Sequence, residues 1–99
     1  MIGRRVSSIA EVKEPGDYCG PITGYTAVNP GCFFLLPIAR DKDVESLARS
    51  IHHVEFPPHT FRECDDGSLE IRESIGALGQ GGKMIWHGFL DEGHVWREV

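Results

Sequence analysis

The sequence lacks any apolar run approaching the roughly 20 residues that a membrane-spanning helix requires. Its first residues, Met1 to Ser7, include two arginines, but no apolar stretch follows them, so a secretory leader is not expected. Basic residues are also few, since 10 Lys and Arg stand against 15 Asp and Glu, a formal net charge of -5. Proteins that bind nucleic acid neutralise phosphates with basic side chains. We therefore expect a cytoplasmic protein that contacts neither membrane nor nucleic acid.

Cysteines are few as well, and they are poorly spaced for a metal site. Cys19, Cys32 and Cys64 are odd in number and far apart, and no C-x-x-C pair is present. This usage favours reduced thiols that act as small apolar core residues. The weak metal-ligand candidates are His59 and Cys64, whose odd separation would put them on opposite faces of a simple strand. The sequence predicts no metal site and no cofactor.

The chain is long enough for a single core. With 99 residues, of which 40% are hydrophobic and 25% charged, we expect one domain over residues 1–99. Glycine and proline interrupt the N-terminal third, so residues 1–24 are interpreted as a loosely structured lead-in. The first strand-like stretch after it is Tyr25 to Val28.

The middle of the chain shows one strand pattern and one helix pattern. Residues 32–38 form a continuous apolar run of strand length and are predicted to be the central buried strand. Apolar residues at positions 44, 47, 48 and 51 then follow helical spacing, which predicts one amphipathic helix over about residues 42–52. Asp41 or Asp43 would cap its N-terminus, and Pro57-Pro58 would prevent its continuation.

Two hairpins complete the predicted fold. Residues 59–75 flank the turn signal Asp65-Asp66-Gly67, and residues 84–98 flank Asp91-Glu92-Gly93. The glycine-rich segment 76–82 connects them and is interpreted as a loop. The expected class is α+β and β-dominated, a small antiparallel sheet of hairpins that carries the buried strand and the helix.

The closing hairpin contains the candidate site. A two-residue turn at Glu92-Gly93 pairs Phe89 with Trp96, and a three-residue loop would shift this register. With the two-residue turn, one face carries Trp86, Leu90 and Val95. The other face carries the candidate ligand- or partner-binding residues, which are His87, Phe89, His94 and Trp96.

The chain also resembles a known family over roughly residues 30–96. The residues that carry the resemblance are Pro30-Gly31-Cys32, Asp66-Gly67-Ser68-Leu69, Ser74-Ile75-Gly76 and Trp86-His87-Gly88-Phe89-Leu90 with Gly93 and Trp96. They resemble a family of small uncharacterised phage and prophage proteins that end in a W-H-G-[FY]-L-x-x-G hairpin. The chain is similar also to a broader domain of unknown function that is sometimes labelled ammonia monooxygenase. The resemblance implies a phage-associated accessory role, in the host cytoplasm, with no established chemistry.

Three functional hypotheses follow. The leading one is a non-enzymatic protein that binds another protein, or itself as a homo-oligomer, through the aromatic face of the closing hairpin. The second is a small-ligand or metal-binding module that uses His87 and His94 with His59 or Cys64. The third, by analogy alone, is a small hydrolase that acts on a nucleotide-type signal. No residue is assigned a catalytic role.

Overall fold

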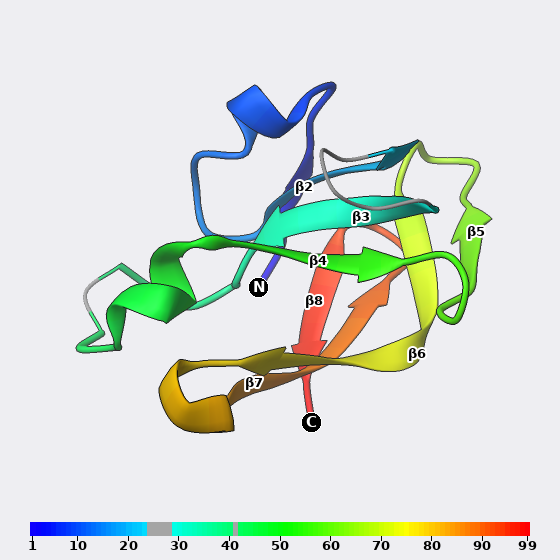
Figure 1. Ribbon diagram of the computed structural model, residues 1–99. Coiled ribbons are helices and arrows are strands. Elements are labelled where there is room, and N and C mark those ends of the chain that lie inside the picture. The colour runs from blue at the N-terminus through cyan, green and yellow to red at the C-terminus, as the bar shows by residue number, and fades with distance from the viewer. Residues whose placement is uncertain (24–28, 41) are drawn as a thin grey trace.

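The protein consists of two four-stranded sheets that face each other (Figure 1). The computed structural model describes residues 1–23, 29–40 and 42–99. The expected strand-like stretch Tyr25 to Val28 and the expected cap Asp41 lie outside these residues. The first sheet has the order β1 (Arg4–Arg5), β2 (Asp17–Thr23), β3 (Pro30–Leu35) and β4 (Ile51–Glu55), and the second has the order β5 (Phe61–Glu63), β6 (Leu69–Leu78), β7 (Met84–Asp91) and β8 (Val95–Glu98). Short 3-10 turns are η1 (Ile9–Glu11), η2 (Ser46–Arg49) and η3 (Gln80–Gly82).

The core lies between the two sheets and is rich in aromatic rings. Trp96 of β8 packs edge-on against Trp86 of β7 at a ring distance of 5.8 Å and against Tyr18 of β2 at 6.0 Å. Aromatic pairs favour this edge-to-face arrangement. The other core residues come from both sheets and from the segments next to them, namely Cys32, Phe34, Leu36, Ala48, Val54, Phe56, Leu69, Ile71, Ile75, Ala77 and Leu90.

The strand predictions are largely confirmed. The expected buried strand 32–38 is β3, which pairs with β2 on one side and β4 on the other. It ends at Leu35, two residues before Pro37, which lacks the N–H that a ladder needs. Both expected hairpins are present, and they form the second sheet together.

The predicted amphipathic helix over residues 42–52 is wrong. Only the short turn η2 forms, and of the four periodic apolar residues only Ala48 is buried, while Leu47 and Ile51 are 41% and 42% exposed. From Ile51 onward the chain pairs with β3 at five successive positions. The inward positions Val54 and Phe56 gain burial in the core by this pairing, and it overrides a weak helical preference.

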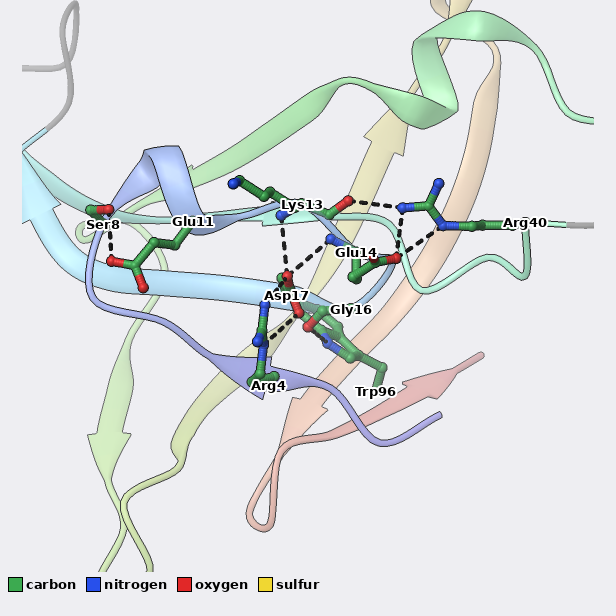
Figure 2. A network of polar contacts seen from close by, with 9 residues as sticks. All are labelled: Arg4, Ser8, Glu11, Lys13, Glu14, Gly16, Asp17, Arg40 and Trp96. Carbon is green, nitrogen blue, oxygen red and sulfur yellow. Dashed lines mark hydrogen bonds and ion pairs between the residues drawn. The ribbon is translucent and has the colours of Figure 1, made fainter.

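Residues 1–23, the described part of the segment interpreted as a loose lead-in, include two strands. This segment contains β1 and β2, and Tyr18 and Cys19 are completely buried. Asp17 is buried too, and it accepts hydrogen bonds from the Arg4 side chain at 3.0 Å and from two backbone N–H groups at 2.9 and 3.1 Å (Figure 2). The amino-acid composition of this segment does not reveal these contacts, because they all depend on one buried carboxylate, that of Asp17.

Candidate functional site

The closing hairpin has a register that differs from the predicted one. Its turn contains three residues, so Leu90 lies opposite Trp96 and Asp91 lies opposite Val95. The predicted pairing of Phe89 with Trp96 is therefore wrong. A one-residue shift moves a side chain to the other face of a strand, and Trp96 is accordingly a core residue, 3% exposed.

Two positive-φ residues at the turn account for this register. Gly93 has φ 86° and His94 has φ 62°, and a three-residue loop needs such a conformation near its end. Contacts to other segments hold both residues. The Gly93 N–H donates to the Ser68 hydroxyl at 2.9 Å, and the His94 ring contacts Tyr18.

The outer face of this hairpin retains two of the four candidate residues, His87 and Phe89. Both are half-buried. The Arg97 guanidinium lies 4.4 Å from the centre of the Phe89 ring and also binds the Asp91 carboxylate at 2.7 Å. An open groove of about 450 Å³ runs beside them. The predicted aromatic face is thus reduced to one phenylalanine that an arginine covers.

Gly88, the glycine of the W-H-G motif, has a packing role. A Cβ atom at this position would clash with the Arg97 carbonyl oxygen and with the Trp86 ring. Only glycine leaves room for Trp86 to pack beneath the β7–β8 ladder.

His94, the third candidate, takes part in a link between the two sheets. Its Nδ1 atom lies 2.7 Å from the Tyr18 hydroxyl, and the same hydroxyl accepts the Leu69 N–H at 3.2 Å. Burial raises the pKa of Tyr18 to about 12, so the phenol keeps its proton at neutral pH. The hydroxyl of β2 thus contacts both the turn between β7 and β8, through His94, and the start of β6, through Leu69.

The structure does not assemble the candidate metal ligands. His59 Nε2 lies 2.9 Å from the Ser74 carbonyl oxygen, and the buried Cys64 thiol lies 3.8 Å from the Arg62 carbonyl oxygen. In residues 1–23, 29–40 and 42–99, no three His, Cys, Asp or Glu side chains are grouped so that they could hold a metal ion.

The other two cysteines are buried thiols. Burial raises the pKa of both Cys19 and Cys32 above the ordinary thiol value. The thiolate is the reactive form of cysteine, so neither side chain is an activated nucleophile at neutral pH.

A site that the sequence did not predict lies at the edge of the first sheet. Among the described residues there are four edge strands, of which β1 and β5 are only two and three residues long. Residues 1–3 cover the outer edge of β8, where the Trp96 N–H donates to the Met1 carbonyl at 2.9 Å and the Gly3 N–H donates to the His94 carbonyl at 2.7 Å. The five-residue strand β4 is the longest edge, and no segment that the structure describes pairs with its outer side (Figure 1).

The direction of the β4 backbone groups follows from one hydrogen bond. The Phe56 N–H donates to the Pro30 carbonyl at 2.8 Å, which identifies this pair as hydrogen-bonded. Hydrogen-bonded pairs alternate along an antiparallel ladder. His52 and Val54 therefore also direct their N–H and C=O groups toward β3.

Ile51, His53 and Glu55 direct their backbone groups away from the sheet. The Glu55 carbonyl accepts the His59 N–H at 3.1 Å, which turns the chain after β4. Within the described part of the chain, no hydrogen bond reaches the outward groups of Ile51 or His53. A strand of another chain could pair with them directly.

β4 also lacks the features with which proteins usually protect an edge. It contains no Lys, Arg or Pro, and its ladder with β3 shows no register shift. Its first residue, Ile51, and Leu47 before it have exposed apolar side chains, and the His53 ring stacks on the Phe33 ring at a centroid distance of 5.4 Å. The signal for this strand was present in the sequence, because buried Val54 and Phe56 alternate with His53 and Glu55.

None of the helical segments in the described residues is long and apolar enough to cross a membrane. In comparisons with known proteins, no family model, curated protein or solved structure matches the chain.

Proposed function

We propose that this protein acts by self-association, through antiparallel pairing of the β4 edges of two copies. The observation that carries the proposal is the outward backbone of Ile51 and His53, on a five-residue edge with which no described segment of the chain pairs. The role is that of a non-enzymatic accessory protein, in keeping with the phage and prophage family that the sequence resembles.

The chemistry of the edge fits a second copy. A two-fold axis places the same residues on both sides of an interface, and an antiparallel edge is self-complementary because every outward N–H meets an outward C=O. Full overlap of two five-residue strands is centred on His53. The first sheet of one copy and the first sheet of the other, each of four strands, would then join into a single sheet of eight strands.

Electrostatics oppose this pairing. Each copy carries a formal charge of -5, so two copies repel each other at low ionic strength. At 0.1 M salt the Debye length is about 10 Å, so the repulsion between exposed charges that lie farther apart than this is largely screened. Association should therefore strengthen as salt is added, the reverse of what an interface based on ion pairs would show.

The test is sedimentation equilibrium over a series of protein concentrations up to about 1 mM. At that concentration, half of the chains are dimeric if the free energy of dimerisation is about -4 kcal/mol. His53→Pro removes the outward N–H at the centre of the edge. It spares the ladder with β3, because the His53 N–H does not point toward that strand. His53→Ala is the matched control, since it loses the same ring and keeps the N–H. We expect the wild type and His53→Ala to dimerise and His53→Pro to remain a monomer.

Ile51→Lys provides a second variant that leaves the backbone intact. A lysine on an edge strand opposes pairing with another chain, and Ile51 is exposed, so the fold should tolerate it. We expect dimerisation to weaken by at least about tenfold, or about 1.4 kcal/mol. A wild type that stays monomeric at about 1 mM, or a His53→Pro variant that dimerises like His53→Ala, would contradict the proposal.

A further inference from the structure

A small cavity of about 120 Å³ lies between the end of β3, the turn η2 and the loop that precedes β2. Its apolar floor includes Leu35, Leu36 and Ala48, and the last two of these are buried. The charged residues that line it are Lys13, Arg40 and Arg49, and of these Arg40 is paired with the nearby Glu14 carboxylate. This is an unusual lining in a chain with a formal charge of -5.

Backbone and side-chain contacts hold the two arginines. Arg40 binds the Glu14 carboxylate at 2.6 and 3.0 Å and the Lys13 carbonyl at 3.1 Å (Figure 2). Arg49 donates to two carbonyl oxygens, those of Arg40 and Lys42, each at 3.0 Å. Carbonyl groups orient a guanidinium without neutralising its charge, so the Arg49 cation is placed in advance at the rim.

We propose that this cavity binds a small organic carboxylate. The apolar part of the ligand packs on Leu35, Leu36 and Ala48, and its carboxylate accepts hydrogen bonds from the Arg49 guanidinium. Arginine suits this role because its planar donors match the two oxygens of a carboxylate. An acid without an apolar part would leave these apolar residues uncovered, and an acid that is too large would not fit into the cavity.

The volume limits the size of the ligand. An apolar protein cavity of about 150 Å³ holds one benzene molecule. A cavity of about 120 Å³ therefore holds an apolar group of roughly four or five carbons. Isovalerate, with a branched four-carbon group and one carboxylate, is a suitable probe. This site does not include the outward backbone of β4, so it stands or falls independently of self-association.

The test is a titration of the protein with isovalerate, followed by two-dimensional amide NMR. Isovaleramide is the matched ligand, since it has the same shape and no charge. We expect saturable shifts at the amides of Leu36, Ala48 and Arg49 with isovalerate, and none that saturate with isovaleramide. This titration of the wild type is decisive without any variant. Chemical shifts that change linearly with isovalerate concentration up to about 50 mM, or equal binding of isovaleramide, would overturn the proposal.

Three variants locate the site. Ala48→Leu fills the cavity and should abolish binding, whereas Arg49→Gln removes the charge and should weaken binding by at least about tenfold. Arg72→Gln, on the second sheet, removes one charge elsewhere and should leave the affinity unchanged. Binding by Ala48→Leu at wild-type affinity, or equal losses in Arg49→Gln and Arg72→Gln, would contradict the assignment.

Discussion

Tyr18→Phe tests the hydrogen-bonded link between the two sheets. The substitution removes one oxygen atom from a completely buried side chain and leaves the ring in place. That oxygen accepts the Leu69 N–H at 3.2 Å and contacts His94 Nδ1 at 2.7 Å. Both contacts cross from the first sheet to the second, so their loss affects the docking of the sheets.

The magnitude follows from what is left behind. The Leu69 N–H stays buried without its acceptor, and an unsatisfied buried donor costs about 1–3 kcal/mol. His94 is only half-buried and can bind water instead, so its lost bond adds little. We expect Tyr18→Phe to lower the free energy of unfolding by about 2 kcal/mol, which is roughly 8–16 °C in Tm for a domain of this size.

Urea denaturation measures this loss, read from the midpoint at an unchanged m-value. A double-mutant cycle with His94→Ala isolates the contribution of the Tyr18–His94 contact, and we expect a coupling of at least about 0.5 kcal/mol. If Tyr18→Phe destabilised the protein by less than about 0.5 kcal/mol, the hydroxyl would not link the sheets as the structure indicates.

Three further predictions concern the hairpin and the buried aspartate. Trp96→Ala should lower the free energy of unfolding by about 3–5 kcal/mol and Phe89→Ala by under about 1.5 kcal/mol, and equal losses in urea denaturation would contradict the observed register. Gly88→Ala should cost at least about 2 kcal/mol, because the new Cβ atom meets the Arg97 carbonyl, and an unchanged thermal midpoint would refute this. Although burial opposes the shift, hydrogen bonds from Arg4 and from the Glu14 and Lys13 N–H groups hold the pKa of Asp17 below its ordinary value. A pKa that is lower in the folded state than in the unfolded state stabilises the protein at pH values above the unfolded pKa, near 4, and this stability is lost as the pH falls below that value. Acid should therefore destabilise the wild type more than Asp17→Asn. Parallel acid-denaturation curves of the two proteins would contradict this prediction.

The sequence predicted the strands where the pattern of apolar residues matched a single kind of element. The run at residues 32–38 and the two turn signals led to β3 and to both hairpins. The hairpin register was not predictable, because it depends on contacts of Gly93 and His94 with Ser68 and Tyr18, which come from other parts of the chain.

β4 was missed for a related reason. Its first residue, Ile51, also completes a helical spacing with residues 44, 47 and 48, and a sequence alone does not show which neighbour the segment will meet. The structure resolves the choice in favour of the ladder with β3. With this correction, the candidate site is the backbone edge of β4 and no longer the aromatic face of the closing hairpin.

Amide hydrogen exchange along β4, followed by NMR at about 20 µM and about 1 mM protein, tests the central claim most directly. The His52 and Val54 amides bond to β3, so they should exchange slowly at both concentrations. The Ile51 and His53 amides point outward, so they should exchange rapidly in the dilute sample and more slowly in the concentrated one, by about twofold when half of the chains are dimeric. Rapid exchange of His53 at both concentrations would contradict self-association through this edge, and slow exchange at both would show that the edge is covered within a single chain.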